Sequence, residues 1–137
     1  MKFSTRGRYA LRLMIDIAQN EEGGYVALKD VAGRQEISVK YLEQIITKLS
    51  KAGLISSLRG CTGGYKTTKD PKEYTAGEIL RAAEGNLVTV DCLKDEKNNC
   101  SRCITCSTLG FWDDFSKVMN DFADSVTLFD LMQGAKV

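Results

Sequence analysis

The chain contains 137 residues, of which 43% are hydrophobic and 27% are charged, and its formal net charge is +1. This composition is typical of roughly one soluble globular domain with a buried core. No apolar run approaches the roughly 18 residues of a membrane helix, and no apolar signal peptide follows the first methionine, so we expect a cytoplasmic protein without membrane contact. The five cysteines are too few for a disulfide scaffold, and the absence of histidine excludes a Ser-His-Asp triad, a Cys-His pair and a histidine-ligated zinc enzyme. We therefore expect no enzymatic activity.

The charges are unevenly distributed along the chain. Residues 1–72 hold 13 Lys and Arg against 7 Asp and Glu, a net charge of +6, whereas residues 73–137 hold 6 against 11, a net charge of −5. A basic half favours nucleic acid as a partner, although an ordinary solvated face also carries runs of charge. The acidic half is better suited to solvent, a partner subunit or a cation.

Three short helices are predicted before Gly53. In residues 5–19, apolar side chains recur at the i, i+4 and i+8 positions of one helical face. A second short helix ends near Gln35, and Ser38 caps a third helix that Gly53 terminates. Three helices in this arrangement indicate a helix-turn-helix layout. The predicted buried positions of the third helix are Leu42, Ile45, Ile46 and Leu49.

A β-hairpin is predicted next. Residues 54–58 and 65–68 resemble two strands, and the glycine-rich residues 59–64 form the turn between them. The order of helix, helix, helix and hairpin is that of a winged helix-turn-helix, so the predicted fold is mainly α with a small β-hairpin. A phosphate-cradling loop is the alternative for glycines beside Arg59, but neither G-x-x-x-x-G-K-[ST] nor G-x-G-x-x-G is present.

The hairpin is followed by a fourth helix and a long loop. Pro71 ends the hairpin, and Thr75 with Glu78 predicts a capping box for a helix that runs to Gly85. We interpret this helix as a connector. Residues 87–106 lack periodicity, and a loop of this length requires a functional explanation or disorder.

The C-terminal part is predicted to form a dimerisation helix. Its apolar residues repeat at intervals of 3, 4, 3 and 4, the spacing of a two-helix seam. These residues are Trp112, Phe115, Met119, Phe122 and Val126. One helix packing on its own domain is the alternative, but a stripe with three aromatic side chains favours burial against the same helix of a second subunit. Thr127 and Asp130 predict a cap for a final short helix.

Four cysteines in the long loop suggest a metal or cluster site. Cys92, Cys100, Cys103 and Cys106 have the spacing C-x7-C-x2-C-x2-C, which lets three sulfur atoms converge from one turn while a fourth folds over them. Spacing alone does not separate iron-sulfur from four-thiolate zinc. Unpaired thiols or a redox dithiol switch are the remaining readings. Cys61, in the predicted wing, is not expected to bind metal.

Six stretches carry a family resemblance: MKFSTRGRYA at 1–10, ISVKYLEQI at 37–45, GLI at 53–55, RGCTGGY at 59–65, TAGEI at 75–79 and EG at 84–85. They resemble the bacterial regulator family that includes the iron-sulfur cluster regulator IscR and the cysteine-metabolism regulator CymR. The resemblance extends over nearly the whole chain. The resemblance implies a dimeric winged-helix transcription factor. It also implies that the third helix enters the major groove, the wing reaches the minor groove, and the long C-terminal helix crosses to the partner subunit.

The resemblance to the IscR-like branch also implies a cofactor. That branch binds a 2Fe-2S cluster through three cysteines and a histidine, and here Cys92, Cys100 and Cys106 occupy the places of the cysteines. The histidine place holds Leu109, so Cys103 is the substitute ligand. An all-thiolate site would lower the reduction potential and could also accommodate 4Fe-4S. The CymR-like branch lacks such cysteines, so the four-cysteine loop argues against it.

The exposed face of the third helix is predicted to contact DNA. Gln44 and Lys48 suit base edges, whereas Lys40 and Tyr41 suit phosphates. By the family resemblance, Glu43 selects among operators by accepting a hydrogen bond from cytosine N4 or by repelling alternatives.

The wing and the first helix complete the predicted interface. Arg59 would enter a narrow A·T minor groove, and Lys2, Arg6 and Arg8 would contact phosphates. The complete predicted set is Lys2, Arg6, Arg8, Ser38, Lys40, Tyr41, Glu43, Gln44, Lys48, Arg59, Gly63, Gly64 and Tyr65. Two copies related by a two-fold axis predict a palindromic operator.

These inferences divide the chain into three parts: a DNA-binding domain at residues 1–85, a cluster-binding loop at 86–106, and the dimerisation and final helices at 107–137. We expect a homodimeric regulator whose operator affinity depends on an iron-sulfur cluster, with 2Fe-2S favoured. The alternatives are a regulator with structural zinc or thiol-based sensing, and a small electron carrier that does not bind specific DNA.

Overall fold

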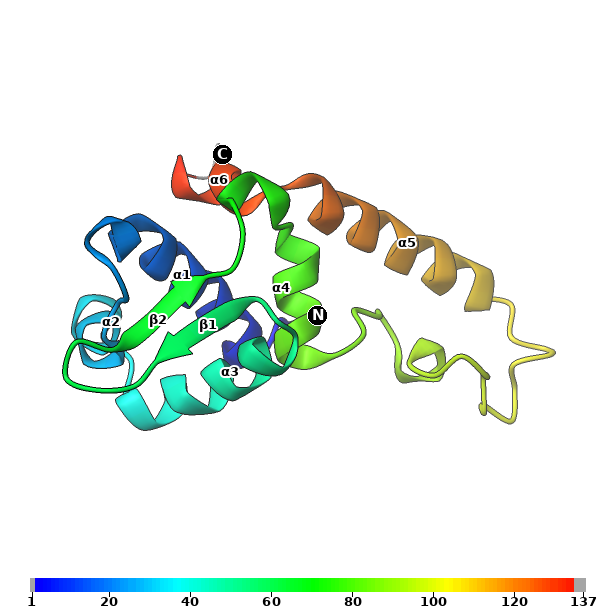
Figure 1. Ribbon diagram of the computed structural model, residues 1–137. Coiled ribbons are helices and arrows are strands. Elements are labelled where there is room, and N and C mark those ends of the chain that lie inside the picture. Colours follow the sequence, from blue (N-terminus) through cyan, green and yellow to red (C-terminus); the bar gives the residue numbers. More distant parts are fainter. Residues whose placement is uncertain (1, 135–137) are drawn as a thin grey trace.

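The computed structural model describes residues 2–134. Its helices and strands follow one another in a single order: α1 (Thr5–Asn20), α2 (Leu28–Gln35), α3 (Val39–Lys51), β1 (Ile55–Leu58), β2 (Gly64–Thr67), α4 (Ala76–Glu84), α5 (Leu109–Ser125) and α6 (Leu128–Met132). Figure 1 shows α1 to α4 and the hairpin gathered into one body, from which α5 projects to one side with the loop that precedes it. The predicted winged helix-turn-helix order is therefore confirmed.

The predicted helix ends agree with the structure because local capping determines them. The Ser38 hydroxyl accepts a hydrogen bond from the backbone N–H of Tyr41 at the start of α3. Thr127 and Asp130 form a complete capping box at the start of α6. The turn between α2 and α3 passes through Glu36, whose φ of 55° is left-handed.

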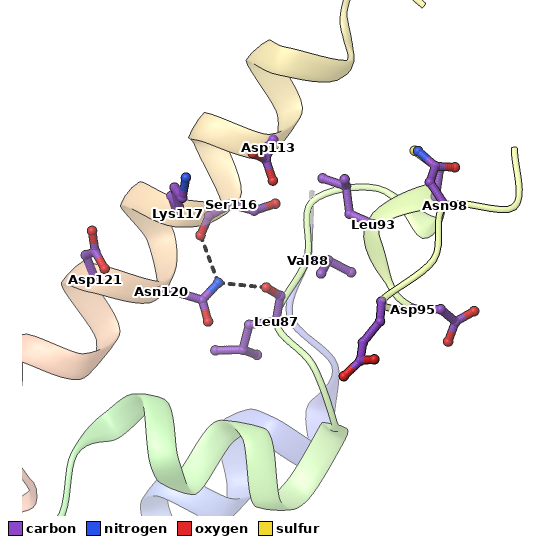
Figure 2. Close-up of a pocket in the computed structure, with 12 residues that line it drawn as sticks. Leu87, Val88, Leu93, Asp95, Asn98, Asp113, Ser116, Lys117, Asn120 and Asp121 are labelled. Carbon is purple, nitrogen blue, oxygen red and sulfur yellow. Dashed lines mark hydrogen bonds between the residues drawn. The ribbon is translucent and has the colours of Figure 1, made fainter. Parts of the chain in front are cut away.

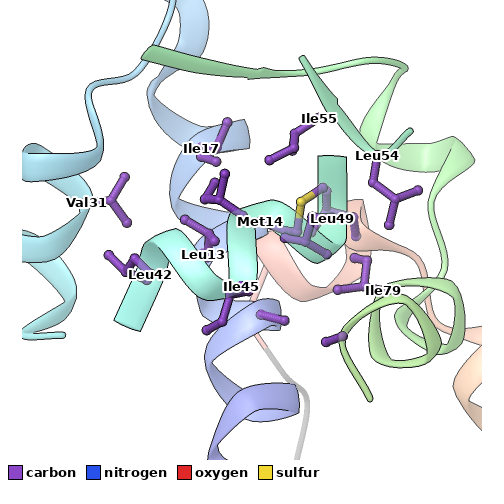
Figure 3. Close-up of a cluster of buried hydrophobic side chains, with 14 of the residues drawn as sticks. Leu13, Met14, Ile17, Val31, Leu42, Ile45, Leu49, Leu54, Ile55 and Ile79 are labelled. Carbon is purple, nitrogen blue, oxygen red and sulfur yellow. The ribbon is translucent and has the colours of Figure 1, made fainter. Parts of the chain in front are cut away.

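The core lies between α1, α2, α3, α4 and the start of β1, as Figure 3 shows. All four apolar positions predicted for the inner face of α3 are buried. The largest fully buried side chains are Leu13, Met14, Ile17, Val31, Leu42, Ile45, Leu49, Tyr74, Ile79 and Leu128, together with the carboxylate-bearing Asp16. Burial of these apolar side chains stabilises the helical body and fixes the direction of the outer face of α3.

The hairpin is held against the helical body by a short bridge. Strands β1 and β2 pair in antiparallel register from Ile55 opposite Thr67 to Leu58 opposite Gly64. Val26 and Tyr65 exchange two backbone hydrogen bonds of 2.8 Å and so form an isolated antiparallel bridge. A side chain at Gly64 would bring a Cβ within 2.2 Å of the Val26 carbonyl oxygen, so this close approach requires glycine.

The interpretation of the fourth helix as a connector is wrong. Helix α4 buries Ile79, Leu80 and Ala83 and packs along α1, so it belongs to the core. The predicted capping box is also only half formed. The Thr75 hydroxyl accepts from the Glu78 backbone, but the Glu78 carboxylate pairs with Lys69 at 3.1 Å instead of returning to the cap.

The start of the long loop is fixed to α5 by side chains of that helix. Asn120 donates to the carbonyl oxygen of Leu87 at 2.8 Å, and the buried Ser116 hydroxyl accepts from the backbone N–H of Thr89 at 3.0 Å. Within residues 90–108, the structure has one short 3-10 turn, Asp91–Leu93. The prediction of a long irregular segment is therefore confirmed. No helix within residues 2–134 is long and apolar enough to cross a membrane.

Candidate nucleic-acid interface and cysteine segment

The outer face of α3 is polar and open to solvent. Lys40, Glu43, Gln44 and Lys48 are all exposed, as the sequence predicted for a reading surface. Tyr41 is only half exposed, because its ring packs edge-on against Tyr9 of α1 with 5.7 Å between ring centroids. The exposed face therefore combines two positive charges with groups that can exchange hydrogen bonds with base edges.

The tip of the wing presents Arg59 to solvent beside Gly60, which has a left-handed φ of 110°. Gly63 packs tightly, since a Cβ there would lie 2.0 Å from the Leu58 carbonyl oxygen. Gly63, Gly64 and Tyr65 are partly buried, so of the four predicted wing contacts only Arg59 is freely exposed. A groove of about 490 Å³ separates the wing from the start of α2.

The amino-terminal end of α1 carries further basic side chains. Lys2, Arg6 and Arg8 are exposed, as expected for phosphate contacts. Sequence reasoning missed Arg12, one helical turn beyond Arg8. Its guanidinium lies over the Tyr9 ring at 5.1 Å and donates from Nε to the Gln35 side chain at 3.0 Å. The sequence signal for Arg12 was its position four residues after Arg8, which places the two arginines on the same face of the helix.

The four loop cysteines do not converge in this structure. Cys92 and Cys103 are partly buried, whereas Cys100 and Cys106 are exposed. Within residues 2–134, no three Cys, Asp or Glu side chains lie close enough together to hold a metal ion. Cys100 and Cys103 share a tight turn, in which the Cys103 N–H donates to the Cys100 carbonyl at 3.2 Å.

Cys106 lies immediately before α5. Hydrogen bonds from the Thr108 side chain and backbone hold the pKa of the Cys106 thiol below its usual value, and the Cys106 Sγ and Thr108 Oγ1 atoms are 3.4 Å apart. A lowered pKa favours the thiolate, which is the form that binds metals.

We call residues 86–108, which lie between α4 and α5, the cysteine segment. A cleft of about 380 Å³ separates it from α5. Figure 2 shows Leu87 and Val88 on the loop side of the cleft and Asp113 on the α5 side, with Asn120 joining the helix to the loop. Cys92 also lines the cleft, so this cysteine faces α5, whereas Cys100 and Cys106 are exposed further along the segment.

The four cysteine thiols are chemically suited to bind a soft metal centre. Four thiols stand within a segment of 15 residues, at positions 92–106, and thiolate ligands select iron-sulfur clusters or zinc. Neither Cys92 nor any side chain from Asp95 to Ser107 belongs to either buried apolar cluster. A movement of these four cysteines would therefore leave the apolar core intact.

Helix α5 presents an apolar stripe to solvent. The exposed fractions are 58% for Phe111, 43% for Phe115, 68% for Val118 and 69% for Phe122. Of the predicted interface residues, Phe115 and Phe122 belong to this stripe. Met119 is partly buried against a small cluster of Leu80, Leu87 and Ala123, and Trp112 and Val126 are also partly buried. Phe111 and Val118, which sequence reasoning missed, complete the stripe.

Comparison with known proteins identifies the family. The Rrf2 family, described as an iron-dependent transcriptional regulator, matches residues 3–134. The chain belongs to the Rrf2 family. It is 37% identical over 137 residues to the HTH-type transcriptional regulator IscR of Escherichia coli O1:K1, with 100% of this chain and 83% of that protein covered.

Two solved structures of Rrf2-type regulators resemble this one. IscR of T. potens matches with a TM-score of 0.78 and 36% identity, over 99% of this chain and 89% of that chain. CymR, the global cysteine regulator of B. subtilis, matches with a TM-score of 0.77 and 36% identity, over 99% of each chain. The predicted family resemblance and fold are thus confirmed, and this Rrf2 protein is a transcriptional regulator.

Proposed function

We propose that this Rrf2 protein is a homodimeric, sequence-specific DNA-binding regulator whose operator affinity responds to an iron-sulfur cluster in the cysteine segment. The observation that carries the DNA-binding role is the outer face of α3. The apolar side chains on the inner face of α3 are buried in the core, and its polar side chains are exposed to solvent beside the wing. An α-helix presented in this way fits the major groove of B-DNA.

The side chains on α3 divide into two roles. Gln44 is suited to a bidentate contact with adenine, and Glu43 can accept a hydrogen bond from cytosine N4. Lys40 and Lys48 are suited to phosphates and base edges. The Ser38 hydroxyl caps α3 and so fixes the first turn of this helix, the turn that would enter the major groove of the DNA.

The wing and the end of α1 add contacts on either side of α3. Arg59 stands at an exposed glycine-rich turn, where it can enter a narrow minor groove whose negative potential attracts arginine. Lys2, Arg6 and Arg8 contribute charge that neutralises phosphates. Binding is therefore expected to weaken steeply as salt concentration rises.

A second copy of the chain is the proposed partner of the apolar stripe on α5. Three large aromatic side chains and one valine in a row are more exposed apolar surface than a monomeric helix ordinarily carries. Pairing two α5 helices about a two-fold axis would bury the stripe and place two α3 helices on one side of the dimer. The operator is then a palindrome with half-sites one or more helical turns apart.

The cysteine segment is the proposed cluster site. Cys92, Cys100, Cys103 and Cys106 would hold the cluster, and the chain has no histidine that could replace one of them. A bound iron-sulfur cluster supplies reversible one-electron chemistry and a reason for the segment to adopt one conformation. The family description as iron-dependent favours iron over zinc.

The proposed effect of the cluster on operator affinity depends on where the cysteine segment is attached. One end is fixed to α5 through Asn120 and Ser116, and the other end leads directly into α5 at Leu109. Drawing the four sulfurs together would therefore act on the helix that sets the spacing of the two DNA-binding domains. A coupling of about 1–3 kcal/mol would change operator affinity 5-fold to 150-fold.

The experiment that tests the DNA-binding role is selection from random duplex DNA by protein prepared without oxygen. We expect enrichment of one inverted-repeat motif, and we expect iron and sulfide in the selected protein with absorption in the visible range. A colourless protein that contains zinc would support the zinc alternative. Failure to enrich any motif, with iron and sulfide present, would favour the electron-carrier alternative.

A further inference from the structure

The amino-terminal end of α1 makes an unusual contact with the far end of α4. The backbone N–H of Gly7 donates to the Oε1 atom of Glu84 at 3.0 Å, across 77 residues of sequence. The same N–H lies 3.4 Å from the Oγ atom of Ser4, the residue that caps α1. The Gly7 N–H has no carbonyl partner within α1, so it is shared between the Ser4 hydroxyl and the Glu84 carboxylate, and the carboxylate is the nearer acceptor.

Gly7 permits this contact because it has no side chain. It is buried, and a Cβ at this position would lie 2.9 Å from Glu84 Oε1 and 3.3 Å from Leu80 Cδ2. The two helices therefore approach closely here, and the carboxylate occupies the space that a side chain would take. A negative charge at this place also complements the positive end of the α1 dipole.

The contact lies directly beneath two of the proposed DNA contacts. Arg6 and Arg8 flank Gly7 in the first turns of α1, and both are exposed. Within residues 2–134 the Arg8 guanidinium makes one hydrogen bond, an exposed one of 3.3 Å to Thr5, so its position depends on the backbone that carries it. A shift or fraying of this turn would move both arginines together.

From this geometry we propose that Glu84 is a positioning residue for DNA binding. Its carboxylate fixes the first turn of α1, and thereby holds Arg6 and Arg8 in register with phosphates of the operator. The inference rests on the proposed DNA-binding function, to which it adds a residue that does not touch DNA. Glu84 is also the last residue of α4, and Gly85 separates it from the segment that leads to the cysteines.

The test uses the full-length protein and the duplex that the selection yields, with operator affinity measured at several salt concentrations. Glu84→Ala should reduce the slope of log affinity against log salt by about 1.8, the value for two lost phosphate contacts. Its preference for the operator over a scrambled duplex should stay unchanged, because phosphates carry no sequence information. Glu84→Gln keeps an acceptor oxygen and should retain the wild-type slope.

Two further variants keep the test decisive if Glu84→Ala unfolds. Gly7→Ala favours helix formation but places a Cβ against the carboxylate, so it should reduce the slope as Glu84→Ala does. Glu78→Ala is the matched control, because Glu78 stands on the same helix and pairs with Lys69 instead. This control should leave the salt slope unchanged.

A double-mutant cycle distinguishes the role of Glu84 from the phosphate contacts of the two arginines on which it depends. In a protein that already carries Arg6→Ala and Arg8→Ala, the Glu84→Ala change should have no further effect on operator affinity. An equal effect in both backgrounds would overturn the role of Glu84 and leave the proposed function intact. If the two arginine changes alone had no effect, the phosphate contacts of the proposed function would fail as well.

Discussion

The buried carboxylate of Asp16 on α1 is bound by the guanidinium of Arg34 near the end of α2. Asp16 is 2% exposed, and it accepts hydrogen bonds from Arg34 at 2.7 Å and 3.1 Å and from the Gln35 side chain at 2.8 Å. The hydrogen bond to Asp16 raises the pKa of Arg34 above its ordinary value, so the guanidinium keeps its positive charge at any physiological pH. The contact fixes the end of α2, and with it the turn that leads into α3.

The two members of this pair are not expected to be equivalent. Arg34→Ala leaves a buried carboxylate without its cation and should destabilise the protein by about 3–5 kcal/mol. Asp16→Asn leaves an arginine whose side chain is 41% exposed and can reach water, so it should cost less, about 1–3 kcal/mol. Urea unfolding measures both. The exposed Asp114→Ala on α5 serves as the control, and equal costs for all three changes would contradict the account.

The stripe on α5 gives a prediction about assembly. Val118→Asp or Phe122→Asp places a charge in the centre of the proposed two-fold interface and should weaken dimerisation by about 2–4 kcal/mol, enough to yield monomers at micromolar concentration. Phe129→Asp, an exposed aromatic position on α6 outside the stripe, is the matched control. Light scattering coupled to size-exclusion chromatography gives the mass directly. A monomeric wild-type protein would contradict the proposed dimer.

Local sequence signals predicted the element boundaries well because each depends on a few neighbouring residues. The Ser38 cap and the Thr127 to Asp130 capping box are read from positions three apart. The role of α4 could not be read in this way. Its inner face packs on α1, some 70 residues earlier in the chain, so only the tertiary arrangement reveals that Ile79 and Ala83 belong to the core.

The faces of α5 show a second limit of prediction from the sequence. Because successive residues turn by about 100°, the predicted seam follows the middle of a broad apolar arc. The structure divides that arc: Met119 packs against Leu80, Leu87 and Ala123, whereas Phe111 and Val118 are exposed to solvent. Sequence alone cannot divide it, since the division depends on where α4 lies. In the same way, the cysteine spacing predicts which residues would bind a metal but not how their sulfur atoms are arranged in space.

Loop cysteines should differ from the wing cysteine in their effect on iron content. Cys103→Ser removes the thiol proposed as the fourth ligand, whereas Cys61→Ser changes an exposed thiol at the tip of the wing. We expect Cys103→Ser to reduce bound iron and visible absorption severalfold and Cys61→Ser to leave both near the wild-type value. Iron and sulfide analysis of anaerobic preparations measures this. Equal losses would reassign the fourth ligand.

Two side chains on α3 should affect DNA binding in different ways. Gln44→Ala should cost about 1–3 kcal/mol on the preferred operator and relax the preference at one base pair in each half-site. Lys40→Ala should weaken binding to all duplexes about equally and reduce the salt slope by about 0.9. Competition with operators altered at single base pairs distinguishes the two patterns. A uniform loss for Gln44→Ala would move that residue to the phosphate contacts.

The central claim is that cluster occupancy controls DNA binding, and one comparison tests it most directly. Operator affinity is measured without oxygen for the cluster-loaded protein and for a variant in which Cys92, Cys100, Cys103 and Cys106 are all alanine. The account predicts a difference between about 5-fold and 150-fold. Identical affinities for the two proteins, with iron and sulfide confirmed in the first alone, would contradict it.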